Sequence, residues 1–333
     1  MELNNKERTR NERVLIVDGL NTFIRTWTVT PVSNDKDYHV GGVVGFLKSV
    51  GYAIKQVQPT RLVIVFDGKG GSKSRKKVDS NYKANRDGAS LRVHRSFLEK
   101  MVTETADESM QRQYNWLVEL LSALPITTMI YDMVEADDVI GYIASDILKD
   151  AEQCVIMSTD KDFLQLVNEK TIVWSPSKKK IYNRKTIREE FGLSHNNLLM
   201  YRILDGDTSD NIQGVKGCGL KTIIKRFPEI VSDEKLDIED IFRLSNDRLT
   251  ESKIYKEILN SEARVRTNYE LMQLSSVTIS GIIKMNILDR FNENVDGFNK
   301  LKFIKLMSSY GMMDLFPNVH TWLRETYETL LSK

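Results

Sequence analysis

The chain has 333 residues, of which 41% are hydrophobic and 28% charged, which is the balance of a globular protein with a buried core. The formal net charge is only +2, so any preference for a charged partner must come from where the charges sit. No window of about 18 apolar residues occurs and the N-terminus is polar, so we expect no membrane span and no signal peptide. The two isolated cysteines, Cys154 and Cys218, offer neither a disulfide framework nor a CxxC metal motif, and they favour a cytoplasmic setting.

Short aliphatic runs separated by helical patterns organise the first half of the chain. The expected strands are residues 14–17, 62–66, 126–131 and 154–157. Apolar residues at helical spacing predict helices over residues 42–57 and 135–149. Strands that alternate with helices predict an α/β fold with a mostly parallel central sheet and helices on both faces.

This alternation breaks in two places. Residues 69–124 form a long insertion between the second and third strands, basic at first and helical from about residue 91. From about residue 185 the pattern is helical almost to the end. We therefore expect a core over residues 1–227 and a helical C-terminal region, residues 228–333, that packs on it.

Acidic residues follow each of the four expected strands and also occupy a later loop. In sequence order the nine acids are Asp18, Asp67, Glu135, Asp137, Asp138, Asp160, Asp162, Asp207 and Asp210. The carboxyl ends of parallel strands share one edge of a sheet, so we expect these acids to converge there. Nine unpaired carboxylates would repel one another strongly, and divalent cations relieve that repulsion. Oxygen ligands favour Mg²⁺ or Mn²⁺, and two such ions roughly 4 Å apart suit phosphodiester hydrolysis.

Each acid also has an ordinary structural interpretation. Asp18 and Asp67 each precede a glycine and can cap a turn or a helix. An acidic first turn after residue 134 can simply favour a helix N-terminus, and Asp160 and Asp162 can belong to a solvated loop. The coincidence of acids at four strand ends is what favours a common site over independent caps.

A basic segment begins directly after Asp67. It contains Lys69, Lys73, Arg75, Lys76, Lys77, Lys83 and Arg86 against the single acid Asp79. A positive patch beside an acidic rim suits a polyanion whose scissile phosphate must reach metal ions. Lys83 and Arg86 share a face if the segment is helical, so the two could clamp one phosphate. A solvated loop explains the same charges equally well.

The glycine-rich segment 214–222 is the last motif. It resembles a phosphate-binding P-loop, but Leu220 separates the last glycine from the lysine and no strand precedes it. A helix–hairpin–helix turn fits better, because its glycines let backbone N–H groups approach a DNA phosphate. The expected contacts are Gly214, Lys216, Gly217, Gly219, Lys221 and Thr222. An ordinary glycine-rich helix connection is the alternative.

Together these motifs resemble the flap endonuclease or 5′→3′ exonuclease superfamily. The matching stretches are residues 14–19, 63–68, 82–86, 135–138, 158–163, 206–212 and 214–222, in the family's order. Residues 174–176 with the lysines after them, and residues 249–252, look similar to the phage ribonuclease H-type branch. That branch removes RNA primers and adjoining DNA during lagging-strand synthesis.

The resemblance implies a role for each motif. Asp18, Asp67, Glu135, Asp137 and Asp138 would hold or orient one Mg²⁺, and Asp160, Asp162, Asp207 and Asp210 a second, with Mn²⁺ able to substitute. Lys83 and Arg86 would act on the scissile phosphate, and Tyr82 and the other basic residues of the segment would contact DNA. Residues 69–124 would form a helical arch over a threaded 5′ end. The hairpin, about residues 205–227, would grip the duplex with a bound K⁺, and Cys218, where a small aliphatic residue is common, would pack as a small hydrophobe.

We therefore expect a PIN-like 5′-nuclease fold with exonuclease and flap endonuclease activity on DNA and RNA–DNA strands. The expected partners are DNA with a 5′ flap, a nick or an RNA–DNA 5′ end, together with a single-stranded-DNA-binding protein docked on the C-terminal region. The chain would act as a monomer, in the host cytoplasm if a phage encodes it. A PIN-type ribonuclease and a catalytically silent junction-binding protein are the alternatives. An aspartyl-nucleophile phosphatase is excluded, because Asp18 lacks a second acid two residues later.

Overall fold

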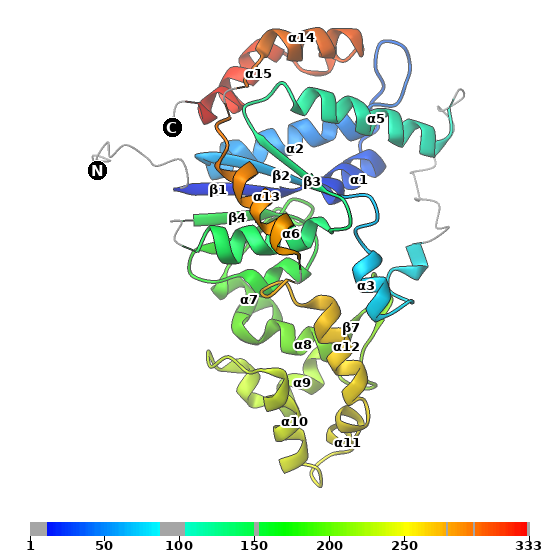
Figure 1. Ribbon diagram of the computed structural model, residues 1–333, viewed down its shortest axis with the longest axis vertical. Helices are drawn as coiled ribbons and strands as arrows, with labels where there is room; N and C mark the ends of the chain where they lie inside the picture. Colours follow the sequence, from blue (N-terminus) through cyan, green and yellow to red (C-terminus); the bar gives the residue numbers. More distant parts are fainter. Residues whose placement is uncertain (1–11, 87–103, 150–152, 278, 296, 332–333) are drawn as a thin grey trace, which may run out of the picture.

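The computed structural model describes residues 12–86, 104–149, 153–277, 279–295 and 297–331. Its central sheet has the strand order β3-β2-β1-β4-β5-β6 (Figure 1). The strands are β1 (Arg13–Asp18), β2 (Arg61–Asp67), β3 (Thr127–Tyr131), β4 (Gln153–Met157), β5 (Thr171–Ser175) and β6 (Lys180–Tyr182). Strands β1 to β5 are parallel and β6 is antiparallel to β5. The four predicted strands and the parallel sheet are confirmed; β5 and β6 were missed, and β6 has too few residues for a periodic signal.

The helices form two layers because neighbouring strand residues point to opposite faces. In β1, Leu15 and Val17 join one hydrophobic cluster, whereas Val14 and Ile16 join the other. The first layer contains α1 (Gly19–Val29), α2 (Gly41–Val57), α5 (Ala106–Leu121), α14 (Lys300–Ser309) and α15 (Val319–Thr326). The second begins with α6 (Ala136–Tyr142), which runs into a π-helical turn, η2 (Ile143–Ile147). Helices therefore cover both faces of the sheet, as predicted.

The second layer continues with most of the later helices, which extend below the sheet in Figure 1 except for α13, which is drawn across the sheet and contacts β3. They are α7 (Arg184–Phe191), α8 (Leu198–Asp205), α9 (Leu220–Arg226), α10 (Ile238–Asp247), α11 (Lys253–Asn260), α12 (Glu262–Met272) and α13 (Gly281–Asn292). A two-stranded ribbon, β7 (Gly206–Asp207) with β8 (Ile212–Gln213), joins α8 to the hairpin before α9. Short helical turns are η3 (Asp162–Leu166), η4 (His195–Asn197), η5 (Pro228–Val231), η6 (Met313–Leu315) and η7 (Glu328–Leu330).

Helices after residue 227 take part in both hydrophobic layers. Phe242, Tyr255 and Phe291 belong to the cluster of the second layer, and Phe303 and Leu323 belong to the cluster of the first. The C-terminal region is helical and packs on the core as expected. The division of the chain at residue 227 stays a prediction. No helix in the described ranges is long and apolar enough to cross a membrane.

The predicted arch insertion is described only in part. It begins with α3 (Lys73–Val78), continues through η1 (Ala84–Arg86) and ends with α5. The stretch 87–103, which was predicted to contribute to the arch, lies outside the described residues. Figure 1 places α3 beside α12, and the two helices are in contact. The base of the insertion therefore touches the C-terminal part of the chain.

Candidate active site

Two acids at strand ends connect neighbouring segments of the sheet edge. Asp18 ends β1 and caps α1 by accepting a hydrogen bond from the Asn21 backbone N–H at 3.2 Å. Its other oxygen accepts from the Ser158 hydroxyl, just past β4, at 2.9 Å. Asp67 ends β2 and accepts from the backbone N–H of Ala136 at 2.9 Å, at the start of α6. The capping interpretation is therefore correct for Asp18, and these caps draw the strand ends together.

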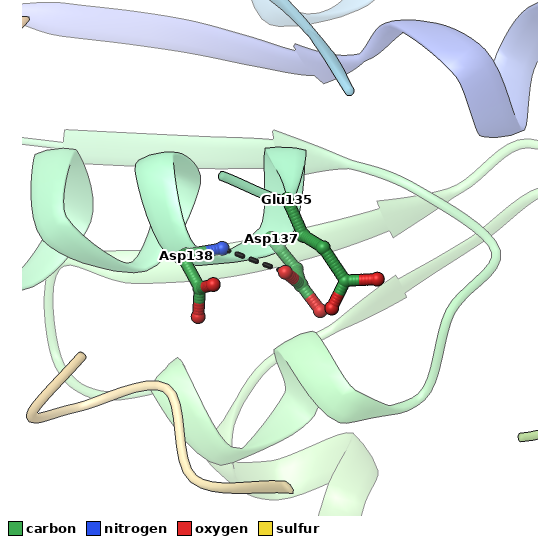
Figure 2. Close-up of side chains that lie close together, drawn as sticks. All are labelled: Glu135, Asp137 and Asp138. Atoms are coloured by element: carbon green, nitrogen blue, oxygen red, sulfur yellow. Dashed lines mark hydrogen bonds between the residues drawn. The ribbon is translucent and has the colours of Figure 1, made fainter. Parts of the chain in front are cut away.

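Three acids at the start of α6 form a compact cluster, which we call the first acidic group: Glu135, Asp137 and Asp138. Figure 2 shows the three side chains on one short segment, with the Asp138 N–H bonded to an Asp137 carboxylate oxygen at 2.8 Å. One carboxylate oxygen from each lies within 4.8 Å of the others. The Arg75 guanidinium, from α3, contacts Glu135, Asp137 at 3.0 Å and Asp138 at 2.7 Å. This guanidinium balances part of the group's negative charge.

The second acidic group contains Asp160, Asp162, Asp207 and Asp210, which come from two separate loops. Arg202 of α8 lies between the loops and binds Asp162 at 2.7 Å and Asp207 at 2.5 Å. Asp160 accepts from the Asp162 N–H at 2.9 Å. Here too a guanidinium supplies the counter-charge.

The two groups lie in one electrostatic neighbourhood. Burial raises the pKa of Asp18 to about 8, and the charges of Asp67 and Asp160 act in the same direction. Burial also raises the pKa of Asp160, with further contributions from Asp210, Asp137 and Asp207. Acids separated by more than a hundred residues thus feel one another's charge. The two groups are therefore neighbours, with the Tyr82 hydroxyl within reach of both Glu135 and Asp210, but among the described residues only the first group brings three carboxylates within 4.8 Å of one another.

Burial makes two further acids hard to ionise. It raises the pKa values of Asp138 and Asp162 to about 7, assisted by the neighbouring charges of Asp137 and Asp160 respectively. Burial acts in the same direction on Asp137 and Asp207. For Asp137 the charges of Arg75 and Lys83 prevail, and its pKa is lowered. For Asp207 the Ser209 hydrogen bond and Arg202 lower the pKa.

Buried oxygen ligands with mutual repulsion suit hard divalent cations. Every acid in the two groups offers only carboxylate oxygen, which is the ligand that Mg²⁺ and Mn²⁺ prefer. A bound cation would favour the ionised forms that burial disfavours. The residues present therefore fit the predicted metal ions.

Lys83 and Tyr82 connect the two acidic groups. The Lys83 ammonium lies 2.5 Å from a Glu135 oxygen, and its backbone N–H donates to the Asp210 carbonyl at 2.9 Å. The Tyr82 hydroxyl reaches Glu135 at 3.2 Å and Asp210 at 3.3 Å. Lys83 adopts a left-handed backbone, with φ of 55°, which is uncommon for a residue with a side chain. This backbone places both of its polar groups against the acids.

The remaining predicted DNA contacts differ in exposure. Lys69, Lys73 and Lys77 are exposed near the start of the insertion, whereas Lys76 is half-buried. Arg75 is buried against the first acidic group, so it sits inside the acidic cluster and not on the outer basic face. The side chain of Arg86 lies outside the described part of the structure.

The hairpin 214–219 follows β8 closely. Gly214 is required there, because a Cβ would come within 2.1 Å of the Asp205 carbonyl oxygen. Gly217 has a φ of 86°, and Gly219 precedes the first residue of α9. Cys218 is 1% exposed and packs in the core, as predicted. Lys216 and Lys221 are exposed and Thr222 is half-buried.

Sequence reasoning missed three polar residues that organise the site. Arg202 precedes Asp207 by five residues on α8, but an isolated arginine in a helix carries no pattern. The Asn21 side chain accepts from the Thr159 N–H at 3.2 Å and hydroxyl at 2.8 Å, which ties α1 to the loop after β4. Ser158 had no recognisable role until its hydroxyl was seen to reach Asp18.

This α/β sheet, with acids gathered at its parallel strand ends, has the arrangement expected of a metal-dependent nuclease. Residues 13–192 match the family described as the 5′-3′ exonuclease N-terminal, resolvase-like domain. A 5′-3′ exonuclease of Bacillus subtilis (strain 168) is 31% identical over 236 residues, which cover 68% of this chain and 73% of that protein. The chain belongs to the 5′-3′ exonuclease family.

Other relatives are longer or more distant. DNA polymerase I of Bacillus subtilis (strain 168) is 28% identical over 316 residues, so 92% of this chain matches only 32% of the polymerase. The chain therefore spans about a third of that relative. The bacteriophage T5 D15 flap endonuclease, solved as a pseudo-enzyme-product complex with DNA and metal ions, shares 21% identity. The superposition covers 89% of this chain and 99% of the T5 chain with a TM-score of 0.63, so the overall fold is the same.

Proposed function

We propose that this protein is a structure-specific 5′-nuclease that hydrolyses phosphodiester bonds at 5′ flaps, at nicks and at RNA–DNA 5′ ends. The observation that carries the proposal is the meeting of the two acidic groups, since the Tyr82 hydroxyl reaches the carboxylates of both Glu135 and Asp210, with the Lys83 ammonium on Glu135. An oxygen-only site beside a lysine suits a phosphodiester, because the acids bind cations and the ammonium attracts the phosphate. Removal of RNA primers in lagging-strand replication is the cellular role we assign.

Two divalent cations, Mg²⁺ with Mn²⁺ able to substitute, are assigned to the two acidic groups. The first would be held or oriented by Asp18, Asp67, Glu135, Asp137 and Asp138, and the second by Asp160, Asp162, Asp207 and Asp210. When bound, such ions supply the positive charge that activates water and neutralises the phosphodiester. The protein's part is to hold these acids in place through hydrogen bonds such as those of Ser158 and Ala136.

Lys83 and Arg86 are assigned to the scissile phosphate. A cation aimed at the phosphate stabilises negative charge that grows in the transition state, in a site where burial weakens screening by water. The exposed Lys69, Lys73 and Lys77 would attract the rest of the strand through their charge. The hairpin, with its exposed Lys216 and Lys221 and a bound K⁺, would grip the duplex behind the cut.

The decisive experiment maps products from end-labelled DNA that carries a 5′ flap, a nick, a gap or an RNA–DNA 5′ end. We expect cleavage near the 5′ junction in Mg²⁺ or Mn²⁺, products with a 5′-phosphate, and no cleavage in excess EDTA. Tight binding of every substrate without cleavage in either metal would instead identify a junction-binding protein. Cleavage of single-stranded RNA in preference to the flap would identify a PIN-type ribonuclease.

The partners are assigned with the same activity. We propose that the protein acts as a monomer and that the helical C-terminal region docks a single-stranded-DNA-binding protein. Light scattering at several protein concentrations tests the first assignment. Co-sedimentation with such a protein, for the wild type and for Ile282→Asp and Leu301→Asp, which change exposed side chains of that region and leave its core in place, tests the second; equal retention of all three chains would remove the docking role.

A further inference from the structure

A buried asparagine lies in an otherwise apolar stripe of α12. The buried residues of this helix include Val265, Asn268 and Leu271, spaced three apart, so Asn268 occupies a core position. It is only 3% exposed. A buried amide is costly unless its hydrogens are bonded, so a partner is expected.

The partners of Asn268 are two backbone carbonyls. Its side-chain nitrogen donates to the Ile203 carbonyl at 2.8 Å and to the Gln213 carbonyl at 2.9 Å. Ile203 lies in the last turn of α8, where carbonyls lack intrahelical donors, and Gln213 lies in β8. One turn earlier in α12, Arg264 donates to the Gly214 carbonyl at 3.4 Å. Both hydrogens of the Asn268 amide are therefore used to join the end of α8 to β8.

The backbone between those two carbonyls carries half of the second acidic group. Residues 204–212 contain Asp207 and Asp210, and the loop is closed by pairing of Gly206 with Gln213 and of Asp207 with Ile212. Asn268 lies at the open end of this ribbon. The ribbon has only two residues in each strand, so its own pairing constrains the loop weakly.

The far side of the same loop supports the base of the insertion. The Lys83 N–H donates to the Asp210 carbonyl at 2.9 Å, and the Asn85 side chain donates to the Thr208 carbonyl at 3.0 Å. The Asn211 side chain in turn donates to the Asn81 carbonyl at 2.8 Å. A shift of the loop would therefore move Lys83 together with Asp207 and Asp210.

We infer that Asn268 is a positioning residue that fixes the loop 204–213, and with it the carboxylates of Asp207 and Asp210, relative to Asp160 and Asp162. It touches neither an acid nor the expected position of the substrate, and it acts through two backbone carbonyls. The inference rests on the proposed function, because it assigns Asn268 to the same metal-binding acids. A hydrogen bond that orients a metal ligand typically changes metal affinity by 10–100-fold.

The test is a Mn²⁺ titration followed by electron paramagnetic resonance, on the full chain and three variants of Asn268. Asn268→Leu keeps a similar size without donors, Asn268→Asp places an acceptor against two carbonyls, and Asn268→Ser keeps one donor. Asp207→Asn identifies which class of bound Mn²⁺ belongs to the second group. We expect the Mn²⁺ affinity of the second acidic group to fall at least about tenfold in the Leu and Asp variants and by less in the Ser variant. The Mn²⁺ affinity of the first group should change less than about twofold.

Kinetics on a 5′-flap substrate provide a second measurement. We expect kcat at low Mn²⁺ to fall by about tenfold in Asn268→Leu, with little change in KM for DNA, and saturating Mn²⁺ to restore the rate. The matched control is Val265→Ala, which creates a cavity in the same helix and has no side-chain hydrogen bond to lose. It should lower the melting temperature but leave both Mn²⁺ classes unchanged.

Two outcomes contradict different claims. Asn268 has only a general structural role in either of two cases. In the first, the Asn268 variants fold and bind the Mn²⁺ ion that Asp207→Asn removes with wild-type affinity. In the second, Val265→Ala weakens the binding of that ion as much as the Asn268 variants do. If the wild-type protein shows no Mn²⁺ class that depends on Asp207, the metal assignment of the proposed function fails first, and this inference fails with it.

Discussion

The two acidic groups are built in opposite ways from the same kind of residue. The first takes Glu135, Asp137 and Asp138 from a four-residue stretch at the start of α6, so local helix geometry brings them together. The second takes its members from the loop after β4 and from the β7–β8 ribbon, more than forty residues away. Arg75 offsets part of the negative charge of the first group and Arg202 part of that of the second, and each reaches its acids from a different element.

This difference shows where each group is vulnerable. The first group depends on the start of one helix, α6, and on the hydrogen bond that the Ala136 N–H donates to the Asp67 carboxylate. The second depends on how two loops are held together, so residues outside both loops, such as Arg202, control its geometry.

Replacing one acid in each group tests whether both are needed. We expect Asp137→Asn and Asp160→Asn each to lower cleavage of a 5′ flap by about 10³-fold or more, because each removes charge that would bind a cation at the reaction centre. DNA binding in Ca²⁺, measured by fluorescence anisotropy, should stay within about threefold of wild type. If only Asp137→Asn abolishes cleavage, the second group serves docking and not catalysis.

The Lys83 ammonium contacts Glu135 of the first group, and Lys83→Ala removes that ammonium while keeping the backbone hydrogen bond to the Asp210 carbonyl. We expect Lys83→Ala to lower single-turnover cleavage by about 10²-fold, since a cation that stabilises the transition state is lost. Affinity for the flap should change little. Lys77→Ala, which removes an exposed lysine of the same insertion, is the control and should affect affinity more than turnover. The reverse pattern would make Lys83 a docking contact.

The two arginines should differ in their effect on stability. Arg75→Gln leaves the buried Glu135 and the half-buried Asp137 and Asp138 without their guanidinium, and Arg202→Gln leaves two half-buried acids without theirs. Without divalent metal we expect a loss of roughly 3–5 kcal/mol for Arg75→Gln and a smaller loss for Arg202→Gln, from urea denaturation. Adding Mg²⁺ should recover part of each loss, because a bound cation supplies the missing charge. A larger loss for Arg202→Gln would overturn this ranking.

The pH dependence of the metal-free protein gives the smallest effect. Burial raises the pKa of Asp18 to about 8 and those of Asp138 and Asp162 to about 7, so the folded chain holds protons that the unfolded chain releases near pH 4. Stability must then fall as pH rises from about 4 to 8. Asp137 and Asp207, with lowered pKa values, are ionised in both states above pH 5 and add no slope.

Differential scanning calorimetry in EDTA measures this change. We expect the melting temperature to fall by roughly 3–6 °C between pH 5.5 and pH 8.0, and Asp18→Asn to flatten the slope. With saturating Mg²⁺ the trend should reverse, because metal binding favours the ionised acids. A melting temperature that rises with pH in EDTA would show that these acids are ionised in the folded, metal-free protein.

Much of the arrangement could be predicted because it follows from chain direction. Parallel strands bring their carboxyl ends to one edge, so Asp18, Asp67 and Asp160 had to meet once their strands paired. The proximity of Glu135, Asp137 and Asp138 needed only the geometry of one helix. The hairpin was visible because its glycines stand close together in the sequence, and the structure adds that a Cβ at Gly214 would come within 2.1 Å of the Asp205 carbonyl oxygen.

Other features had no local signal. The edge strand β6 has three residues, and the periodic pattern of a strand needs more. The helices after residue 227 read simply as amphipathic, and nothing in their spacing says which face of the sheet each one covers. Packing alone assigned α12 below the sheet and α15 above it.

The sequence by itself determined the fold class, the acidic strand ends and the basic segment beside them, because those depend on periodicity and on residue type. Only the tertiary structure decided that Arg75 is an internal counter-ion, that Arg202 joins two loops and that Asn268 holds one of them. The physical reason is the distance along the chain over which each feature is encoded. A periodic pattern is visible within a few neighbouring residues, whereas the partner of a buried charge or amide is whichever group the completed fold brings within about 3 Å.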